Sequence, residues 1–230
     1  MNAPDFPVRS QLSEDVARFV RKRIFNGAYP AGEYVRLDQL AAELGISVTP
    51  VREALCGLRA EGLLEQQPHR GFVVLPVTGR DIVDVADVQA YIGGELAARA
   101  AANISGDQLG ELEAIQDQLE DAYTSDDEDR AVRLNHEFHR AINVAADSPK
   151  LAQLMSQITR YAPESVFPTI CGWPAKSIKH HRLVLAALTK HDGVLARSAM
   201  AEHLTTGAAP LIDHLIERGV VEPTGRPKAR

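Results

Sequence analysis

The chain has 230 residues, of which 45% are hydrophobic and 24% are charged, and its net charge is −6 at pH 7. This composition is ordinary for a folded globular protein, and no apolar run approaches the roughly 18–20 residues that a membrane span requires. The acidic balance argues against a protein that coats nucleic acid without selectivity. The first ten residues lack the basic region and apolar stretch of a secretory signal, so we expect a cytoplasmic protein without a membrane partner.

Charge and histidine content divide the chain near residue 78. Residues 1–78 carry equal numbers of acidic and basic side chains, whereas residues 79–230 carry the whole net charge of −6 and seven of the eight histidines. We therefore predict one domain over residues 1–78, a second over residues 79–219 and a flexible, polar tail over residues 220–230.

The first part has the pattern of three helices followed by a hairpin. Residues 12–26 form an amphipathic helix, a short helix follows from Gln39 to Leu44 and closes at Gly45, and a third begins after the N-cap Ser47 and runs to about Ala60. Two short strands, residues 63–66 and 71–75, flank a turn with the sequence PHRG. This order predicts a winged helix-turn-helix with a β-hairpin wing.

The second part is helical in pattern almost throughout. Glycine, proline and serine breaks divide residues 80–218 into about six helices of ordinary length, and no strand pattern of any strength is present. We predict a mainly α protein whose C-terminal domain is an all-α antiparallel bundle.

The third helix of the first part carries residues suited to reading DNA. Ser47, Thr49 and Arg52 lie at its N-terminal end, where hydroxyl and backbone N–H groups suit phosphates and an arginine can reach guanine O6 and N7. The alternative is an ordinary helix pair in which Arg52 forms a salt bridge with a nearby acid.

Four segments in this order resemble the GntR superfamily of bacterial regulators: GAYPAGEYV, LAAELGISVTPVREAL, LRAEGLL and PHRGFVV. The resemblance covers residues 10–76 and implies DNA contacts at Ser47, Thr49, Arg52, His69, Arg70 and Gly71. It also shows one departure, because Val48 stands where many relatives carry arginine.

Three histidines of the second part are placed so that they can converge. His139 lies in one helical segment, while His181 near the start of another segment and His203 near the end of the next face each other if those two helices are antiparallel. Three imidazoles with open positions suit Zn²⁺, Ni²⁺ or a related divalent transition metal. The alternative is that these histidines only pack in the core.

The segments LNHEFHRAI, HRLVLAAL and AMAEHL resemble the FCD domain, the helical sensor of FadR-type members of the same superfamily. The resemblance implies a metal bound by Asn135, His139, His181 and His203, with an amide at Asn135 where relatives usually have an aspartate. It also implies an effector pocket that includes Gln89 and Gly93.

These observations favour a homodimeric transcription regulator, expected to be a repressor, that binds a pseudo-palindromic double-stranded operator. The resemblance implies that a small organic or sugar acid bound beside the metal controls operator affinity. Two other functions remain open from the residues: a metal-dependent hydrolase that uses the three histidines, and a structural or interaction protein in which they only pack. The hydrolase lacks a well-placed general base, since no HExxH motif is present.

Overall fold

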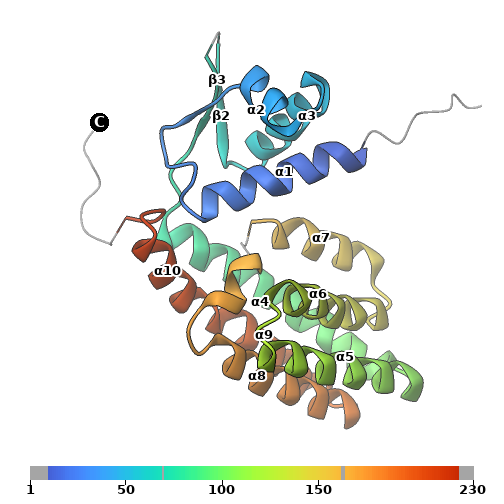
Figure 1. The fold of residues 1–230 in the computed structure, drawn as a ribbon. Coiled ribbons are helices and arrows are strands. Elements are labelled where there is room, and N and C mark those ends of the chain that lie inside the picture. Colours follow the sequence, from blue (N-terminus) through green and yellow to red (C-terminus); the bar gives the residue numbers. More distant parts are fainter. Residues whose placement is uncertain (1–9, 69, 162–163, 223–230) are drawn as a thin grey trace, which may run out of the picture. The chain divides into compact units, whose positions relative to one another are not determined.

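The computed structural model describes residues 10–68, 70–161 and 164–222, and it divides into two compact units. One unit comprises Met1–Thr78 together with Leu215–Arg230, and the other comprises Gly79–His214. Figure 1 shows a smaller unit with a sheet and a larger helical unit. None of the helices in the described residues is long and apolar enough to cross a membrane.

The smaller unit is a winged helix-turn-helix, as the sequence predicts. Its elements are α1 (Ser10–Phe25), β1 (Tyr34–Val35), α2 (Leu37–Leu44), α3 (Val48–Ala60), β2 (Leu64–Gln67) and β3 (Gly71–Val74). The strands form an antiparallel sheet in the order β1-β3-β2, in which Tyr34 pairs with Val73 and Leu64 with Val74. Strand β1 is an addition to the predicted elements, because two residues are too few to show a strand pattern.

The apolar faces of α1 and α3 form the core of this unit. Val20 of α1 and Val51, Leu55 and Leu58 of α3 are all completely buried. Gly45 ends α2 in the left-handed conformation, with φ of 66°, and so allows the sharp turn into α3. The core and the turn at Gly45 therefore fix the orientation of α3 relative to α1 and α2.

An ion pair ties the start of the unit to the end of α3. The Arg21 guanidinium donates to both carboxylate oxygens of Glu61, at 2.7–3.1 Å, and the two side chains are only 10% and 13% exposed. A largely buried bidentate pair of this kind fixes the position of α1 relative to the C-terminal end of α3.

The end of the chain completes the smaller unit. Val221 is 2% exposed, and Val220 lines the same small cavity as Ile24, Tyr29 and Val74. Gly27, with φ of 81°, has no room for a side chain, since a Cβ would lie 2.9 Å from the backbone oxygen of Arg218. Val220 and Val221 of the expected tail are thus packed against the unit, and residues 223–230 lie outside the described residues.

The larger unit is an all-α bundle. Its elements are α4 (Gly79–Asn103), α5 (Gly106–Thr124), α6 (Glu128–Ala145), α7 (Pro149–Thr159), a 3-10 helix η1 (Glu164–Thr169), α8 (Trp173–Thr189), α9 (Gly193–Thr206) and α10 (Ala208–Glu217), of which the last three residues are assigned to the smaller unit. The described residues of this unit thus form seven α-helices where the sequence suggests about six. The last predicted helix divides at Gly207, which packs so closely that a Cβ would lie 3.0 Å from the Trp173 ring.

Helix α4 runs through the bundle and packs most extensively on α9. Small residues of α4 permit this close packing. A Cβ on Gly94 would lie only 3.1 Å from the backbone oxygen of Arg197 on α9, and Ala97, Ala100 and Ala101 of α4 are completely buried. Helices α6, α8 and α9 (Figure 1) each contribute one of three histidines that lie close together.

Candidate DNA-binding surface and candidate metal centre

The N-terminal end of α3 presents its polar side chains to solvent. Ser47 occupies the N-cap position, and Ser47, Thr49 and Arg52 are exposed while Val51 on the opposite face is completely buried. Among the described residues Arg52 forms no ion pair or hydrogen bond, so the alternative in which it is held by a nearby acid is not found. An unpaired guanidinium at this position is available for a base edge or a phosphate.

The turn between β2 and β3 forms the tip of the wing. Arg70 is exposed there, and its backbone N–H donates to the Gln67 carbonyl. Gly71 has φ of 97°, and a Cβ would lie 2.9 Å from the Val35 carbonyl oxygen, so the close pairing of β3 with β1 requires glycine. His69 lies outside the described residues. DNA contacts at all six positions remain predictions.

Three imidazoles meet inside the larger unit. His139 of α6, His181 of α8 and His203 of α9 place their ligand atoms within 4.8 Å of one another. The Nε2 atom of His203 lies 3.3 Å from Nε2 of His181 and 3.3 Å from Nε2 of His139. Antiparallel helices α8 and α9 bring His181 and His203 together, as their positions in the sequence predict.

Burial favours the neutral form of two histidines in this cluster. His181 is 0% exposed and His203 4%, and burial lowers the pKa of both imidazoles well below the ordinary value of 6.5. The neighbouring histidines lower these pKa values further, because two imidazolium ions at such distances repel each other. Neutral imidazoles are the form that binds a metal ion.

The geometry of the cluster fits a cation better than hydrogen bonding alone. A neutral imidazole nitrogen carries either one proton or one lone pair, so His203 Nε2 can form a well-aligned hydrogen bond with only one of its two neighbours. Tetrahedral zinc with bonds of about 2.0–2.1 Å separates its ligands by about 3.3–3.4 Å. The two Nε2–Nε2 distances of 3.3 Å match that separation, and the residues present therefore fit a divalent transition metal.

Sequence reasoning missed Gln116, which contacts the cluster from α5. Its side chain is completely buried, and its Oε1 lies 2.8 Å from Nδ1 of His181. Phe138 also contacts His181, with ring centroids 4.0 Å apart and planes 6° from parallel. An isolated glutamine has no spacing pattern that marks it as a ligand partner, so only the packing of α5 on α8 could have revealed it.

The remaining predicted site residues lie on α4 and α6. Asn135 is half-buried, one helical turn before His139. Gln89 is 7% exposed within α4. Above Gly93 the space is filled, since a Cβ would lie 2.5 Å from Cδ1 of Leu204 and 3.5 Å from Cγ of Met200. Close packing of α4 on α9 thus accounts for this glycine, and its part in an effector pocket stays a prediction.

Several buried polar atoms near the cluster have no hydrogen-bond partner. They are Nδ1 of His180, Nδ1 of His203 and Oγ of Ser177. The Tyr123 hydroxyl lies close to Ser177, although the pair falls outside hydrogen-bond geometry, and burial raises the pKa of this phenol. Because unpartnered buried polar groups are costly, this region is suited to a polar molecule or ordered water.

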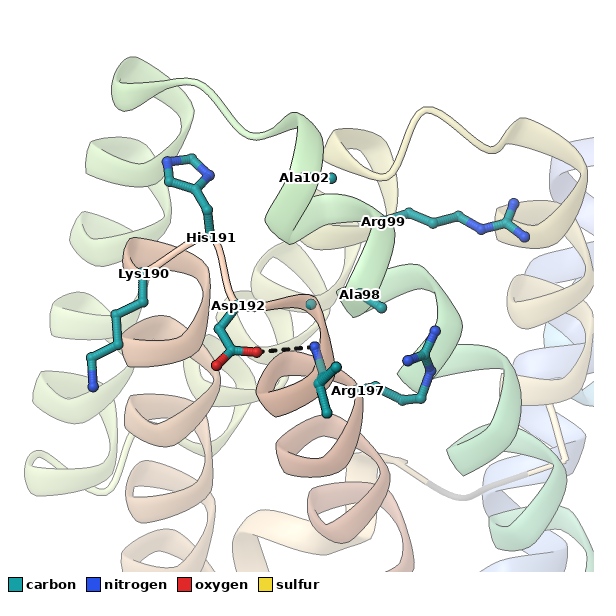
Figure 2. Close-up of a pocket in the computed structure, with 9 residues that line it drawn as sticks. Ala98, Arg99, Ala102, Lys190, His191, Asp192 and Arg197 are labelled. Carbon is teal, nitrogen blue, oxygen red and sulfur yellow. Dashed lines mark hydrogen bonds between the residues drawn. The ribbon is translucent and has the colours of Figure 1, made fainter.

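An open hollow in the described surface lies elsewhere. It has a volume of about 680 Å³, is widely open to solvent and is lined mainly by α4 and the turn from α8 to α9, including Arg99, Lys190 and Arg197 (Figure 2). Asp192 caps α9 at this end by accepting from the Val194 N–H. Arg197 is the lining residue of α9 nearest to His203, six residues or about 9 Å before it at 1.5 Å per residue, and none of the three clustered histidines lines the hollow.

Both parts of the chain match described families of regulators. Residues 12–74 match the bacterial regulatory proteins of the gntR family, and residues 84–206 match the FCD domain. The chain belongs to the GntR family, in the branch with an FCD domain. This GntR protein is therefore a DNA-binding transcription regulator.

Full-length relatives of this GntR regulator have the same organisation. It is 28% identical over 197 residues to a probable D-xylose utilization operon transcriptional repressor of Paenarthrobacter nicotinovorans, covering 85% of this chain and 87% of that protein. It is 27% identical over 207 residues to the regulator McbR of Escherichia coli, covering 87% and 92%. The solved McbR structure superposes with a TM-score of 0.71, covering 89% of this chain and 98% of that one.

These relatives are transcription regulators and not enzymes, so the hydrolase alternative gains no support. The helical unit with its three neighbouring histidines is accordingly the FCD domain of a regulator. A structural protein without DNA binding is equally disfavoured, because the complete winged motif is present.

Proposed function

We propose that this GntR protein is a homodimeric repressor whose affinity for a pseudo-palindromic operator is set by a small acid bound beside a metal ion in the FCD domain. The observation that carries the proposal is the combination of an exposed, unpaired Arg52 on α3 with a cluster of three imidazoles, of which His181 and His203 are buried. One feature supplies DNA reading and the other supplies sensing.

DNA binding is proposed for the α3 end and the wing. Ser47 and Thr49 would contact phosphates and fix the register, while Arg52 would read a base in the major groove. His69, Arg70 and Gly71 would lie at the minor groove or the backbone. Since residues 1–78 carry no net charge, one copy would bind weakly, and two copies related by symmetry would match two half-sites.

Metal binding is proposed for His139, His181 and His203, with Asn135 as a fourth contributor of an amide oxygen. The donor set of neutral imidazoles suits Zn²⁺ or Ni²⁺. When bound, such an ion supplies positive charge and open positions that an anionic oxygen ligand can occupy. Two of the three spacings within the cluster, from His203 Nε2 to Nε2 of His181 and of His139, are already 3.3 Å and so support a tetrahedral ion at this place.

The proposed effector is a small organic or sugar acid. The unpartnered Nδ1 of His180 and Oγ of Ser177 would accept or donate hydrogen bonds to its polar groups, and the buried Gln89 of α4 would contribute its amide. The D-xylose utilization operon named for the Paenarthrobacter relative supports a ligand derived from sugar metabolism. A ligand that binds one packing of the helices more tightly than another would shift the regulator between states of different operator affinity.

The test is fluorescence anisotropy of purified protein with a labelled duplex from the region upstream of its gene. We expect binding at moderate salt, and a change in affinity when Zn²⁺ or Ni²⁺ is present together with candidate sugar acids or dicarboxylates. His139→Ala should abolish the response and preserve DNA binding, whereas His136→Ala, at a nearby exposed position on α6, should preserve both. An absence of DNA binding under all conditions would overturn the proposed repressor function.

A further inference from the structure

A chain of polar contacts connects the surface of the bundle to the buried histidines. Arg182 donates from Nε to Oε1 of Glu120 at 2.7 Å, and the Gln116 amide donates to the same oxygen at 3.0 Å. The other end of the Gln116 amide lies 2.8 Å from Nδ1 of His181. The four residues come from two helices, α5 and α8, which pack side by side (Figure 1).

The donor and acceptor of each hydrogen bond in this series follow from the ion pair between Glu120 and Arg182 at the surface. A carboxylate paired with a guanidinium only accepts hydrogen bonds, so Gln116 must turn its NH₂ group toward Glu120. Its carbonyl oxygen is then the only atom that can face His181. Because a carbonyl oxygen only accepts, the proton of His181 must lie on Nδ1, and Nε2 must carry a lone pair.

We propose that Gln116, aligned by the Glu120–Arg182 ion pair, is a positioning residue that sets the tautomer of His181 and so presents the lone pair of its Nε2 to the metal ion. This inference rests on the proposed metal site and adds the residues that prepare it. Neither Glu120 nor Arg182 touches the metal-binding atoms. They act through Gln116 alone.

Two further observations support a positioning role. Gln116 is completely buried, so its amide has no water to satisfy it if the contacts with His181 and Glu120 are lost. Phe138 stacks on the His181 ring at 4.0 Å and fixes the plane of the ring, while the hydrogen bond to Gln116 fixes its rotation within that plane. Together they point Nε2 at His203.

The test compares three variants by two measurements. Gln116→Leu removes the acceptor. Arg182 also donates to Asp117 at 2.6 Å, so the charge swap combines Glu120→Lys and Arg182→Glu with Asp117→Asn. It keeps an ion pair at the surface without placing two carboxylates together, and it offers Gln116 a donor in place of an acceptor. The control is Gln118→Leu, an exposed position on the same helix whose side chain donates only to the Ala114 carbonyl. The first measurement is long-range ¹H–¹⁵N NMR of the imidazoles in metal-free protein, with His181 assigned by the loss of its signals in His181→Asn.

We expect wild type and Gln118→Leu to show His181 protonated on Nδ1. The charge swap should move the proton to Nε2, because the ammonium group that it introduces would turn the Gln116 amide around, and the amide would then donate to Nδ1 instead of accepting from it. The swap lies at the surface and keeps the fold even if Gln116→Leu does not. A His181 tautomer that is unchanged in the charge swap, or protonated on Nε2 in wild type, would overturn the inference.

The second measurement is calorimetric titration with ZnCl₂ and NiCl₂. Loss of a partner of this kind weakens metal binding by about 10–100-fold, so we expect the Kd to rise by that factor in Gln116→Leu and in the charge swap and to stay within about twofold in Gln118→Leu. An equal Kd in all proteins would contradict the inference. The NMR result is independent of metal, so a wild type that binds no ion would refute the proposed metal site and leave the tautomer assignment to be judged separately.

Discussion

Acidification should destabilise the FCD domain of the metal-free protein, because two buried histidines resist protonation only while the domain is folded. In the unfolded chain their pKa returns to about 6.5. In the folded domain burial holds the pKa of His181 and His203 well below that value. Between the two pKa values the unfolded chain binds more protons, so the stability present above pH 6.5 is lost as the pH falls toward the folded pKa.

The size of the effect follows from the number of histidines. Each histidine that takes up a proton only on unfolding removes about 1.4 kcal/mol between pH 7.5 and pH 5.5, so the pair removes about 2.7 kcal/mol. Domains of this kind are stable by only about 5–15 kcal/mol in total. The loss is therefore large enough to shift a denaturation midpoint clearly.

Urea denaturation monitored by tryptophan fluorescence would measure this loss. Trp173 is the only tryptophan in the sequence, is 7% exposed and lies with its ring 6.0 Å from the His203 ring, so its emission reports unfolding of the region in question. We expect the midpoint to fall steadily between pH 7.5 and pH 5.5. His203→Gln should reduce the pH dependence to about half, whereas His136→Gln, at an exposed position on α6, should leave it unchanged.

A free energy of unfolding that is constant over this range would show that the cluster does not stay neutral. Stability that rises as the pH falls would be a stronger contradiction, since it would require imidazolium to be favoured in the folded interior.

Three further changes test the DNA-binding unit. Arg21→Met should destabilise it by about 3–5 kcal/mol in thermal denaturation, because Glu61 would remain as a buried, unpaired carboxylate; a loss below about 1 kcal/mol would show that water reaches that carboxylate. Arg52→Ala should weaken operator binding by about 1–3 kcal/mol, with Arg59→Ala at the other end of α3 as the unaffected control in the same gel shift. Gly71→Ala should cost about 1–3 kcal/mol through its positive φ and the close Val35 carbonyl, and an unchanged melting temperature would contradict this strain.

The helices and the convergence of three histidines could be predicted because both follow from local periodicity. His181 lies in the first half of α8 and His203 near the end of α9, and a short turn at Asp192 and Gly193 joins the two helices. Helices joined by so short a turn run antiparallel. Positions along two helices then decide which side chains face each other.

Features that depend on tertiary packing could not be predicted in the same way. Strand β1 forms because β3 pairs with Tyr34 and Val35. Two residues are too few to show a pattern that would predict this pairing. Gly93 could mean space for a ligand or close helix packing, and only the position of Leu204 shows that the space is filled. The contact of Gln116 with His181 joins residues 65 apart, so it depends on how α5 lies against α8.

The packing of Val220 and Val221 has a consequence for domain recombination among regulators of this kind. The polypeptide leaves the DNA-binding unit at residue 78, builds the FCD domain and returns at residue 215 to finish the unit it began. A fragment that stops at residue 78 would lack Val221 and leave Ile24 and Val74 at an incomplete surface. A chimera that joins this DNA-binding unit to another sensor domain must therefore include residues 215–222 as well as residues 1–78. Recombination at a single point between them would separate the two segments that form the unit.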